Sequence, residues 1–208
     1  ANGIPSPAVI SLPSPLSLHS FSYPLVCKPR YGAGSQATFL VQDDEGLARS
    51  VLQARDEGWS SELILQPYIP GLPVSVALLS GAGQLIPLPA VQQHLSTEGR
   101  FHYRGGQLPL VEDLDRRARR LAVWAAHAVK ELHGYFGVDL VLGEAADGSA
   151  DAVIEINPRL TTSYVGLRRL AQFNLAETLL AIATGTPTPP LQWGIKPIVF
   201  RADGSFLS

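Results

Sequence analysis

Apolar and polar positions along this chain follow two patterns, one typical of strands and one typical of helices. Short apolar runs bounded by turn-forming residues predict strands at residues 23–28, 37–41, 63–66, 74–79, 85–88, 138–142 and 151–157. Residues 74–79 and 85–88 should pair about a Gly-Ala-Gly turn, and residues 138–142 and 151–157 about an Asp-Gly turn. The pattern therefore predicts two hairpins among the strands.

Two long segments carry apolar residues at helical spacing. The first covers residues 45–57 behind a cap at Asp43 or Asp44, and the second covers residues 113–133 behind a cap at Asp113. Helices mixed with hairpins in this way predict an α+β fold. The expected buried positions of the two helices are Leu47, Val51 and Leu52, and then Leu114, Leu121, Trp124, Ala125, Ala128 and Leu132.

A third helix is predicted by its two ends. Asn174 and Glu177 have the spacing of a capping box, and Gly185 supplies the stop. The start of the second helix is unusual because basic residues there oppose the helix macrodipole. These basic residues form either a solvated face or an anion-binding face of the helix. They are Arg116, Arg117, Arg119 and Arg120.

Segments rich in proline, serine and glycine divide the chain. We expect an extended connector over residues 1–20, a small lobe over 21–70, a large lobe over 71–190 and a proline-rich tail over 191–208. Residues 91–109 are polar and contain glycines, and they read either as a functional loop or as an exposed one.

Charge and cysteine content narrow the classes of function. The 208 residues carry a formal net charge of −2 with both signs interspersed, so we expect no nucleic-acid partner and no membrane partner. No apolar run approaches the roughly 18 residues of a membrane span. The one cysteine, Cys27, cannot form an internal disulfide, and we expect a cytoplasmic, reducing compartment.

The chain has no methionine and begins with Ala1-Asn2-Gly3, which resembles a turn after a missing helix. We therefore expect that an N-terminal part is absent from it.

The second hairpin carries the most informative chemistry. Alternation places Val153, Glu155 and Asn157 on one face of the last strand. A turn centred near residue 147 sets Asp139 opposite Glu155, and two facing carboxylates repel unless a cation lies between them. Carboxylate and amide oxygens suit Mg²⁺. Arg159, just past the strand, offers a planar fork for phosphate or carboxylate. The alternative is a strand end with solvated polar residues.

A second candidate site follows the first strand. Lys28 on that strand precedes a small-residue loop at residues 30–36. Glycines let backbone N–H groups approach an anion, although a plain hairpin turn explains the same residues. Residues 67–71 contain two prolines and then a glycine, as a connection between lobes would.

In this order and spacing, the elements resemble the ATP-grasp superfamily of carboxylate–amine ligases. That resemblance implies two α+β lobes that grip ATP in a cleft, behind an N-terminal α/β domain that this chain lacks. It implies that Mg²⁺, or Mn²⁺ in its place, is held by Asp139, Glu155 and Asn157, and that Arg159 and Lys28 are catalytic. Nucleotide-binding residues would be Lys28, Gly32, Gly34, Ser35, Gln66, Pro67, Tyr68 and Ile69.

Residues 155–167, with 103–106 and 73–76, resemble the branch that contains tyramine–L-glutamate ligase of methanofuran biosynthesis. The function implied is amide formation from a small carboxylate and an amine through an acyl phosphate. The partners implied are those substrates and the missing N-terminal domain, and a homo-oligomer is left open. Two departures are Leu72 and Pro73, where many members have an acidic ribose contact, and a first phosphate-binding lysine that would lie upstream. They keep open a non-catalytic nucleotide-binding module, and a ligase for another amino acid or peptide is also open.

Overall fold

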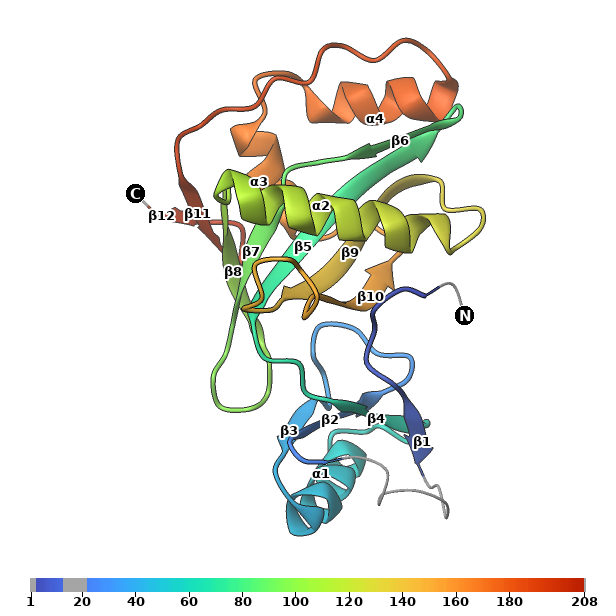
Figure 1. The fold of residues 1–208 in the computed structure, drawn as a ribbon, viewed down its shortest axis with the longest axis vertical. Coiled ribbons are helices and arrows are strands. Elements are labelled where there is room, and N and C mark those ends of the chain that lie inside the picture. The colour runs from blue at the N-terminus through green and yellow to red at the C-terminus, as the bar shows by residue number, and fades with distance from the viewer. Residues whose placement is uncertain (1–2, 13–21, 208) are drawn as a thin grey trace. The chain divides into compact units, whose positions relative to one another are not determined.

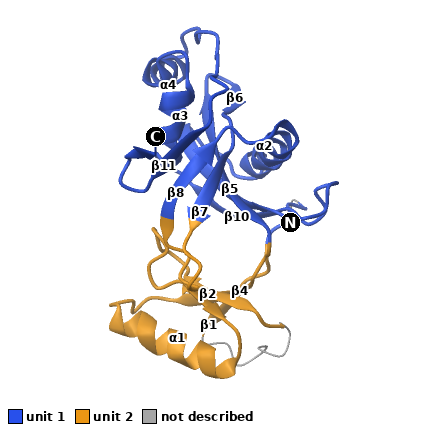
Figure 2. Cartoon of the chain, turned by 90° about the vertical axis from the view of Figure 1, so that its left-hand side faces the viewer, with its two compact units in different colours: residues 1–6, 71–94, 104–208 blue, residues 7–70, 95–103 orange. Residues whose placement is uncertain are grey.

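The computed structural model describes residues 3–12 and 22–207. The chain forms two compact units, which Figure 2 colours separately. The smaller unit comprises residues 7–70 and 95–103, and the larger unit comprises residues 1–6, 71–94 and 104–208. The chain thus passes between the units four times, and the loop at residues 95–103 belongs to the smaller unit although both its neighbouring segments belong to the larger one.

The smaller unit is an antiparallel four-stranded sheet covered by one helix. The sheet order is β1-β4-β2-β3, and the strands are β1 (Ile10–Leu12), β2 (Leu25–Pro29), β3 (Phe39–Val41) and β4 (Leu63–Pro67). Helix α1 (Asp44–Asp56) begins where the Asp43 side chain accepts a hydrogen bond from the Gly46 N–H. Its buried residues close a core with Leu25, Phe39 and Leu65.

The larger unit is built on an eight-stranded sheet of order β10-β9-β5-β7-β8-β11-β12, with β6 paired to β5. The strands are β5 (Leu72–Gly81), β6 (Gln84–Pro87), β7 (Val91–Leu95), β8 (Tyr103–Leu108), β9 (Gly134–Leu142), β10 (Ala152–Asn157), β11 (Ile198–Arg201) and β12 (Phe206–Leu207).

Helix α2 (Glu112–His127) lies along one face of this sheet and packs on Val74, Val76 and Val138 (Figure 1). Helices α3 (Ser163–Leu170) and α4 (Leu175–Thr184) contact the sheet as well, and α4 meets β5 closely at Gly81. A Cβ at Gly81 would lie 2.7 Å from Ile182 atoms, so this approach requires glycine.

Several predicted helix features are confirmed and others are wrong. Asn174 caps α4 by accepting from two backbone N–H groups, and Gly185 ends it in the left-handed conformation (φ 70°). Helix α2, however, starts at Glu112 behind Val111, with no side-chain cap, and stops at His127. Leu52 and Trp124, predicted as buried, are 59% and 47% exposed.

Several elements were not predicted at all. Residues 91–109, read as a loop, contain β7 and β8, while α3, β11 and β12 lie in segments without a strong apolar pattern. Residues 10–12, inside the expected connector, form β1 and pair with β4. Residues 3–9 of that connector form no helix or strand, and residues 1–2 and 13–20 lie outside the described residues. The proposed domain boundaries stay a prediction.

Within the described residues, no helix combines the length and the apolar character that crossing a bilayer requires.

Candidate functional site

The β9–β10 hairpin pairs the residues that its turn predicted. Glu155 lies opposite Asp139, and Asn157 lies opposite Gly137. The predicted face of β10 is partly wrong, because a bulge between Val153 and Glu155 interrupts the alternation. Val153 pairs with Leu140 and packs in the core under α2, while Glu155 and Asn157 share the other face with Asp139.

Side chains of the hairpin converge on the amide of Asn157. Its Nδ2 donates to Asp139 Oδ2 at 3.0 Å and to Glu155 Oε1 at 2.9 Å. Arg159 Nη2 donates to Asn157 Oδ1 at 3.2 Å, and Arg159 Nη1 donates to the Leu160 carbonyl at 3.3 Å. The structure therefore brings together all four residues that the sequence assigned to this hairpin. Their roles as ligands and catalyst remain predictions.

Two neighbours of Asp139 were missed by the sequence. Gln93 on β7 donates from Nε2 to Asp139 Oδ1 at 3.2 Å, and Ser75 on β5 pairs directly with Asp139. Strand β5 lies between β7 and β9, so Gln93 reaches across it. The signal available was the pair of glutamines at residues 92–93, but only the strand order shows which of them faces the carboxylates.

The far end of the hairpin is fixed to helix α2. Arg117 binds Asp151 through Nε at 3.2 Å and Nη2 at 2.5 Å, and it also donates to the Gly143 carbonyl at 3.0 Å. Asp151 Oδ1 accepts from the Gly143 N–H at 2.9 Å. The Arg117 and Asp151 side chains are only 12% and 6% exposed. Of the four basic residues considered for anion binding, Arg117 is thus a structural ion-pair partner that holds the hairpin loop.

Burial makes Asp139 an unusual carboxyl group. Burial raises its pKa to about 6, and the facing carboxylate of Glu155 adds to that effect. The hydrogen bond from Asn157, the neighbouring Ser75 hydroxyl and the charge of Arg159 act in the opposite direction. Two carboxylates held this close are therefore costly to ionise together without a cation.

We expect this pair to make the metal-free protein less stable as the pH rises from about 4 to about 6. In that window the folded state keeps the Asp139 proton, whereas the unfolded chain has lost it. The free energy of unfolding therefore falls as the pH rises, by about 1.4 kcal/mol for each unit of pKa difference between the two states. Above pH 6 the effect should level off. Thermal unfolding in a chelating buffer from pH 4.5 to 7.5 measures it.

The comparison needs an Asp139→Asn variant, because carboxyl groups with lowered pKa, such as Asp147 and Asp203, change stability in the opposite direction. Glu155, Arg159 and Tyr135 face Asp139 and stay unchanged in both proteins. The expectation is contradicted if the stability of the wild type, relative to that of Asp139→Asn, does not fall between about pH 4 and about pH 6.

The donor set fits a hard divalent cation. Two carboxylates and an amide oxygen are the oxygen ligands that Mg²⁺ prefers. Across the described residues, no group of three or more histidine, cysteine, aspartate or glutamate side chains could hold a metal ion. In the structure the NH₂ group of Asn157, and not its Oδ1, faces the two carboxylates. The Asn157 amide must therefore rotate before its Oδ1 can bind a cation together with them.

The other predicted residues lie in the smaller unit. Lys28 on β2 pairs with Ile64 on β4, and the loop that follows, residues 31–36, is mostly exposed. We call this loop the flap. Within it Gly34 has a φ of 64° and Ser35 one of 57°, and Ser35 Oγ donates to the Phe101 carbonyl at 2.8 Å.

The predicted adenine frame follows β4. Gln66 is buried and pairs with Val26, and the Tyr68 N–H donates to the Pro24 carbonyl at 3.0 Å. The Tyr68 amide is thereby occupied, although the prediction counted on backbone groups of residues 66–69. The Tyr68 ring contacts the Phe101 ring at 6.1 Å between centroids. The assignment of these residues to adenine stays a prediction.

We expect amide hydrogens of the flap to exchange rapidly in the free protein and more slowly with Mg·ATP. Glycine-rich backbone has little of its own to hold it, and contacts to phosphate would order it. Hydrogen exchange followed by mass spectrometry measures this on residues 31–36. Unchanged exchange in the presence of saturating Mg·ATP would remove the flap from the nucleotide site.

Comparison with known proteins identifies the class to which this fold and hairpin belong. Residues 2–163 match the ATP-grasp domain, and the chain belongs to this family. The resemblance inferred from the sequence and the predicted α+β fold are thereby confirmed.

Among curated relatives, the chain is similar to two tyramine–L-glutamate ligases. It is 31% identical to that of Methanocaldococcus jannaschii over 145 residues, which is 70% of this chain and 43% of that protein. It is 29% identical to that of Methanocaldococcus fervens over 122 residues, 59% of this chain and 38% of the relative. The chain spans less than half the length of these relatives.

Solved structures share the fold. An L-amino acid ligase from Bacillus licheniformis superimposes with a TM-score of 0.75 at 20% identity, over 95% of this chain and 49% of that one. The N5-carboxyaminoimidazole synthetase of Staphylococcus aureus, complexed with ADP, gives 0.76 at 18% identity, over 95% and 52%.

Proposed function

We propose that this chain is the nucleotide-binding part of an ATP-dependent carboxylate–amine ligase. The observation that carries the proposal is the cluster of Asp139, Glu155, Asn157 and Arg159 on one hairpin of an ATP-grasp domain. Support comes from relatives that are ligases and from a structural neighbour that holds ADP. Their substrates and their activity belong to longer proteins.

In this proposal Asp139, Glu155 and Asn157 would hold Mg²⁺, or Mn²⁺ in its place. Bound there, the cation would neutralise phosphate charge and so ease transfer of the terminal phosphoryl group. Arg159, exposed beside the amide oxygen of Asn157, would contact the transferred phosphoryl group. Lys28 and the flap glycines Gly32 and Gly34, with Ser35, would contact the other phosphates. Residues 66–69 would frame adenine.

The reaction follows from what a carboxylate lacks. A carboxylate is a poor acylating agent, and phosphorylation gives it a good leaving group. Arg159 and Lys28 would neutralise the charge that develops as the phosphoryl group moves to the substrate carboxylate. The flap would exclude water, because hydrolysis of the acyl phosphate competes with attack by the amine. The amine then displaces phosphate, and an amide forms.

The substrates proposed first are L-glutamate and tyramine, from the names of the relatives. Another amino acid or peptide pair uses the same chemistry. A second function, nucleotide binding without turnover, is favoured by one observation. Leu72 and Pro73 begin β5, where many family members have an acidic ribose contact, and they pair with Leu142 and Val141.

The test is phosphate release from ATP by the protein with pooled amino acids and amines. Release that depends on both pools supports a ligase, and splitting the pools identifies the pair. Binding of Mg·ADP by calorimetry without any release would favour the binding module. If the protein neither binds Mg·ADP nor releases phosphate, the proposed function is overturned.

A further inference from the structure

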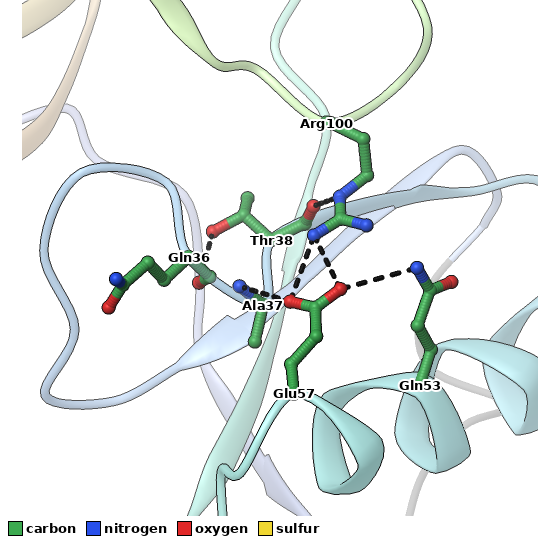
Figure 3. A network of polar contacts seen from close by, with 6 residues as sticks. All are labelled: Gln36, Ala37, Thr38, Gln53, Glu57 and Arg100. Carbon is green, nitrogen blue, oxygen red and sulfur yellow. Dashed lines mark hydrogen bonds and ion pairs between the residues drawn. The ribbon is translucent and has the colours of Figure 1, made fainter.

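Glu57 stands where a helix least favours a carboxylate. It is the C-cap of α1, at the negative end of the helix dipole. Its carboxylate is nevertheless fully engaged. Arg100 Nη2 donates to Oε1 at 2.8 Å and to Oε2 at 3.0 Å, and the Ala37 N–H donates to Oε2 at 3.1 Å. Gln53 adds a bond of 3.2 Å (Figure 3). The position is therefore explained by these partners and not by the helix.

Arg100 is held on several sides. Besides Glu57, its Nε donates to the Thr38 carbonyl at 3.1 Å (Figure 3). Its guanidinium also lies 4.3 Å from the centre of the Phe39 ring. The Arg100 and Glu57 side chains are 20% and 30% exposed, whereas the Arg49–Glu45 pair on α1 is 63% and 82% exposed. The planar guanidinium of Arg100 donates to a backbone carbonyl and to a carboxylate at the same time, so the Arg100–Glu57 pair is more than a surface ion pair.

Arg100 lies in the loop at residues 95–103, and it joins this loop to Glu57 and to Thr38, two residues after the flap. Two further contacts hold the loop, from the Leu40 N–H to the Gly99 carbonyl at 2.7 Å and from Ser35 Oγ to the Phe101 carbonyl. All of these residues belong to the smaller unit. Its loop 95–103 is connected to β7 and β8 of the larger unit.

The backbone at this junction is strained. Ser35, Ala37 and Phe101 have positive φ values of 57°, 46° and 55°, which non-glycine residues adopt only at a cost. Such residues persist where surrounding contacts hold them. The bond from the Ala37 N–H to Glu57, and the bond of Ser35 to Phe101, provide those contacts.

We propose that Arg100 and Glu57 form an anchor for the flap, positioning its C-terminal end so that only residues 31–36 move when nucleotide phosphate binds. The anchor is defined as these two side chains with the backbone of Ala37 and Thr38. Arg100 and Glu57 are positioning residues that act through the flap. This inference rests on the proposed function, because it takes the flap as the phosphate contact. An anchored flap loses less conformational freedom on binding than a loose one.

The test compares Arg100→Gln and Glu57→Gln with Arg49→Gln as the matched control, since Arg49 is an exposed arginine in an ion pair on the same unit. In the free protein, the Ala37 and Leu40 amides should exchange faster in the two anchor variants and unchanged in the control. Mg·ADP affinity should fall roughly tenfold, about 1.4 kcal/mol. Arg100→Lys keeps the charge without the planar fork, so its amide exchange and Mg·ADP affinity should lie between those of the wild type and Arg100→Gln. It serves as the test if Arg100→Gln does not fold.

Faster exchange with Mg·ADP affinity equal to wild type would overturn the proposal, because the pair would then only stabilise the fold. Unchanged exchange at Ala37 would overturn it as well. If the wild-type protein binds no Mg·ADP, the proposed function fails and the role in nucleotide binding fails with it. The exchange measurements then still decide whether Arg100 and Glu57 hold the end of the flap.

Discussion

Replacing Asp139 with asparagine should lower Mg²⁺-dependent affinity for ADP by at least roughly 100-fold. Mutations of residues that only orient metal ligands cost about 10- to 100-fold in metal affinity, so loss of a charged ligand should reach the upper end of that range. The same change should raise the melting temperature of the metal-free protein by about 2–4 °C, because it relieves the repulsion between Asp139 and Glu155. Calorimetry with Mg·ADP and thermal unfolding in chelator measure the two effects.

The opposite signs of these two effects make the result specific. A variant that merely damaged the fold would lose affinity and stability together. Glu144→Gln is the matched control, since Glu144 is an exposed carboxylate in the loop of the same hairpin. Glu155→Gln should follow Asp139→Asn in affinity. If Asp139→Asn binds Mg·ADP as tightly as wild type, the hairpin does not hold the metal.

The hairpin illustrates how much of the site local sequence can predict. A turn centred near residue 147 placed Asp139 opposite Glu155 without any structure, and that pair is confirmed. The pairs nearer the turn, such as Val153 with Leu140, are one residue out of this register, and the bulge restores it. The bulge after Val153 could not be seen, because an inserted residue leaves no mark in a short apolar run. Its effect is useful to the site, since it buries Val153 under α2 while Glu155 and Asn157 keep the face of Asp139.

Contacts between distant strands were beyond prediction. Gln93 reaches Asp139 only because β5 lies between β7 and β9 with the small residue Ser75 at that point. Strand order is a property of the whole sheet, and the polar composition of β7 hid even the strand itself. Arg100 was invisible for the same reason, because nothing in its own sequence indicates that it binds Glu57, 43 residues earlier.

Helix α2 shows a different failure. Apolar spacing continues beyond His127, yet the helix stops there and the Ala128 and Val129 N–H groups bond to Ala125 and Ala126 in a tight last turn. Periodicity records which residues can face a core, and it does not record where the chain must leave the helix to enter β9. The ends of α4 were predicted correctly because its caps are specific residues, Asn174 and Gly185.

Arg159 could serve the fold or the reaction, and its exposure and contacts bear on the first of these roles. A structural arginine is normally buried against a carboxylate, as Arg117 is against Asp151. Arg159 is exposed, and within the described part of the chain it has no ion pair with a carboxylate. Its hydrogen bonds go to the Asn157 amide oxygen and the Leu160 carbonyl. Little of the stability of the fold therefore depends on it.

Arg159→Lys should lower turnover roughly 100-fold, because lysine keeps the charge but cannot make two parallel bonds to a transferring phosphoryl group. Mg·ADP affinity should stay within several-fold, and the melting temperature should shift by no more than about 2 °C, since an exposed side chain contributes little to stability. Phosphate release with the substrate pair from the pooled assay, calorimetry and thermal unfolding measure the three quantities. Arg168→Lys, an exposed arginine on α3, is the control. A melting temperature lowered by many degrees, with the rate of the remaining folded enzyme unchanged, would instead assign Arg159 a structural role.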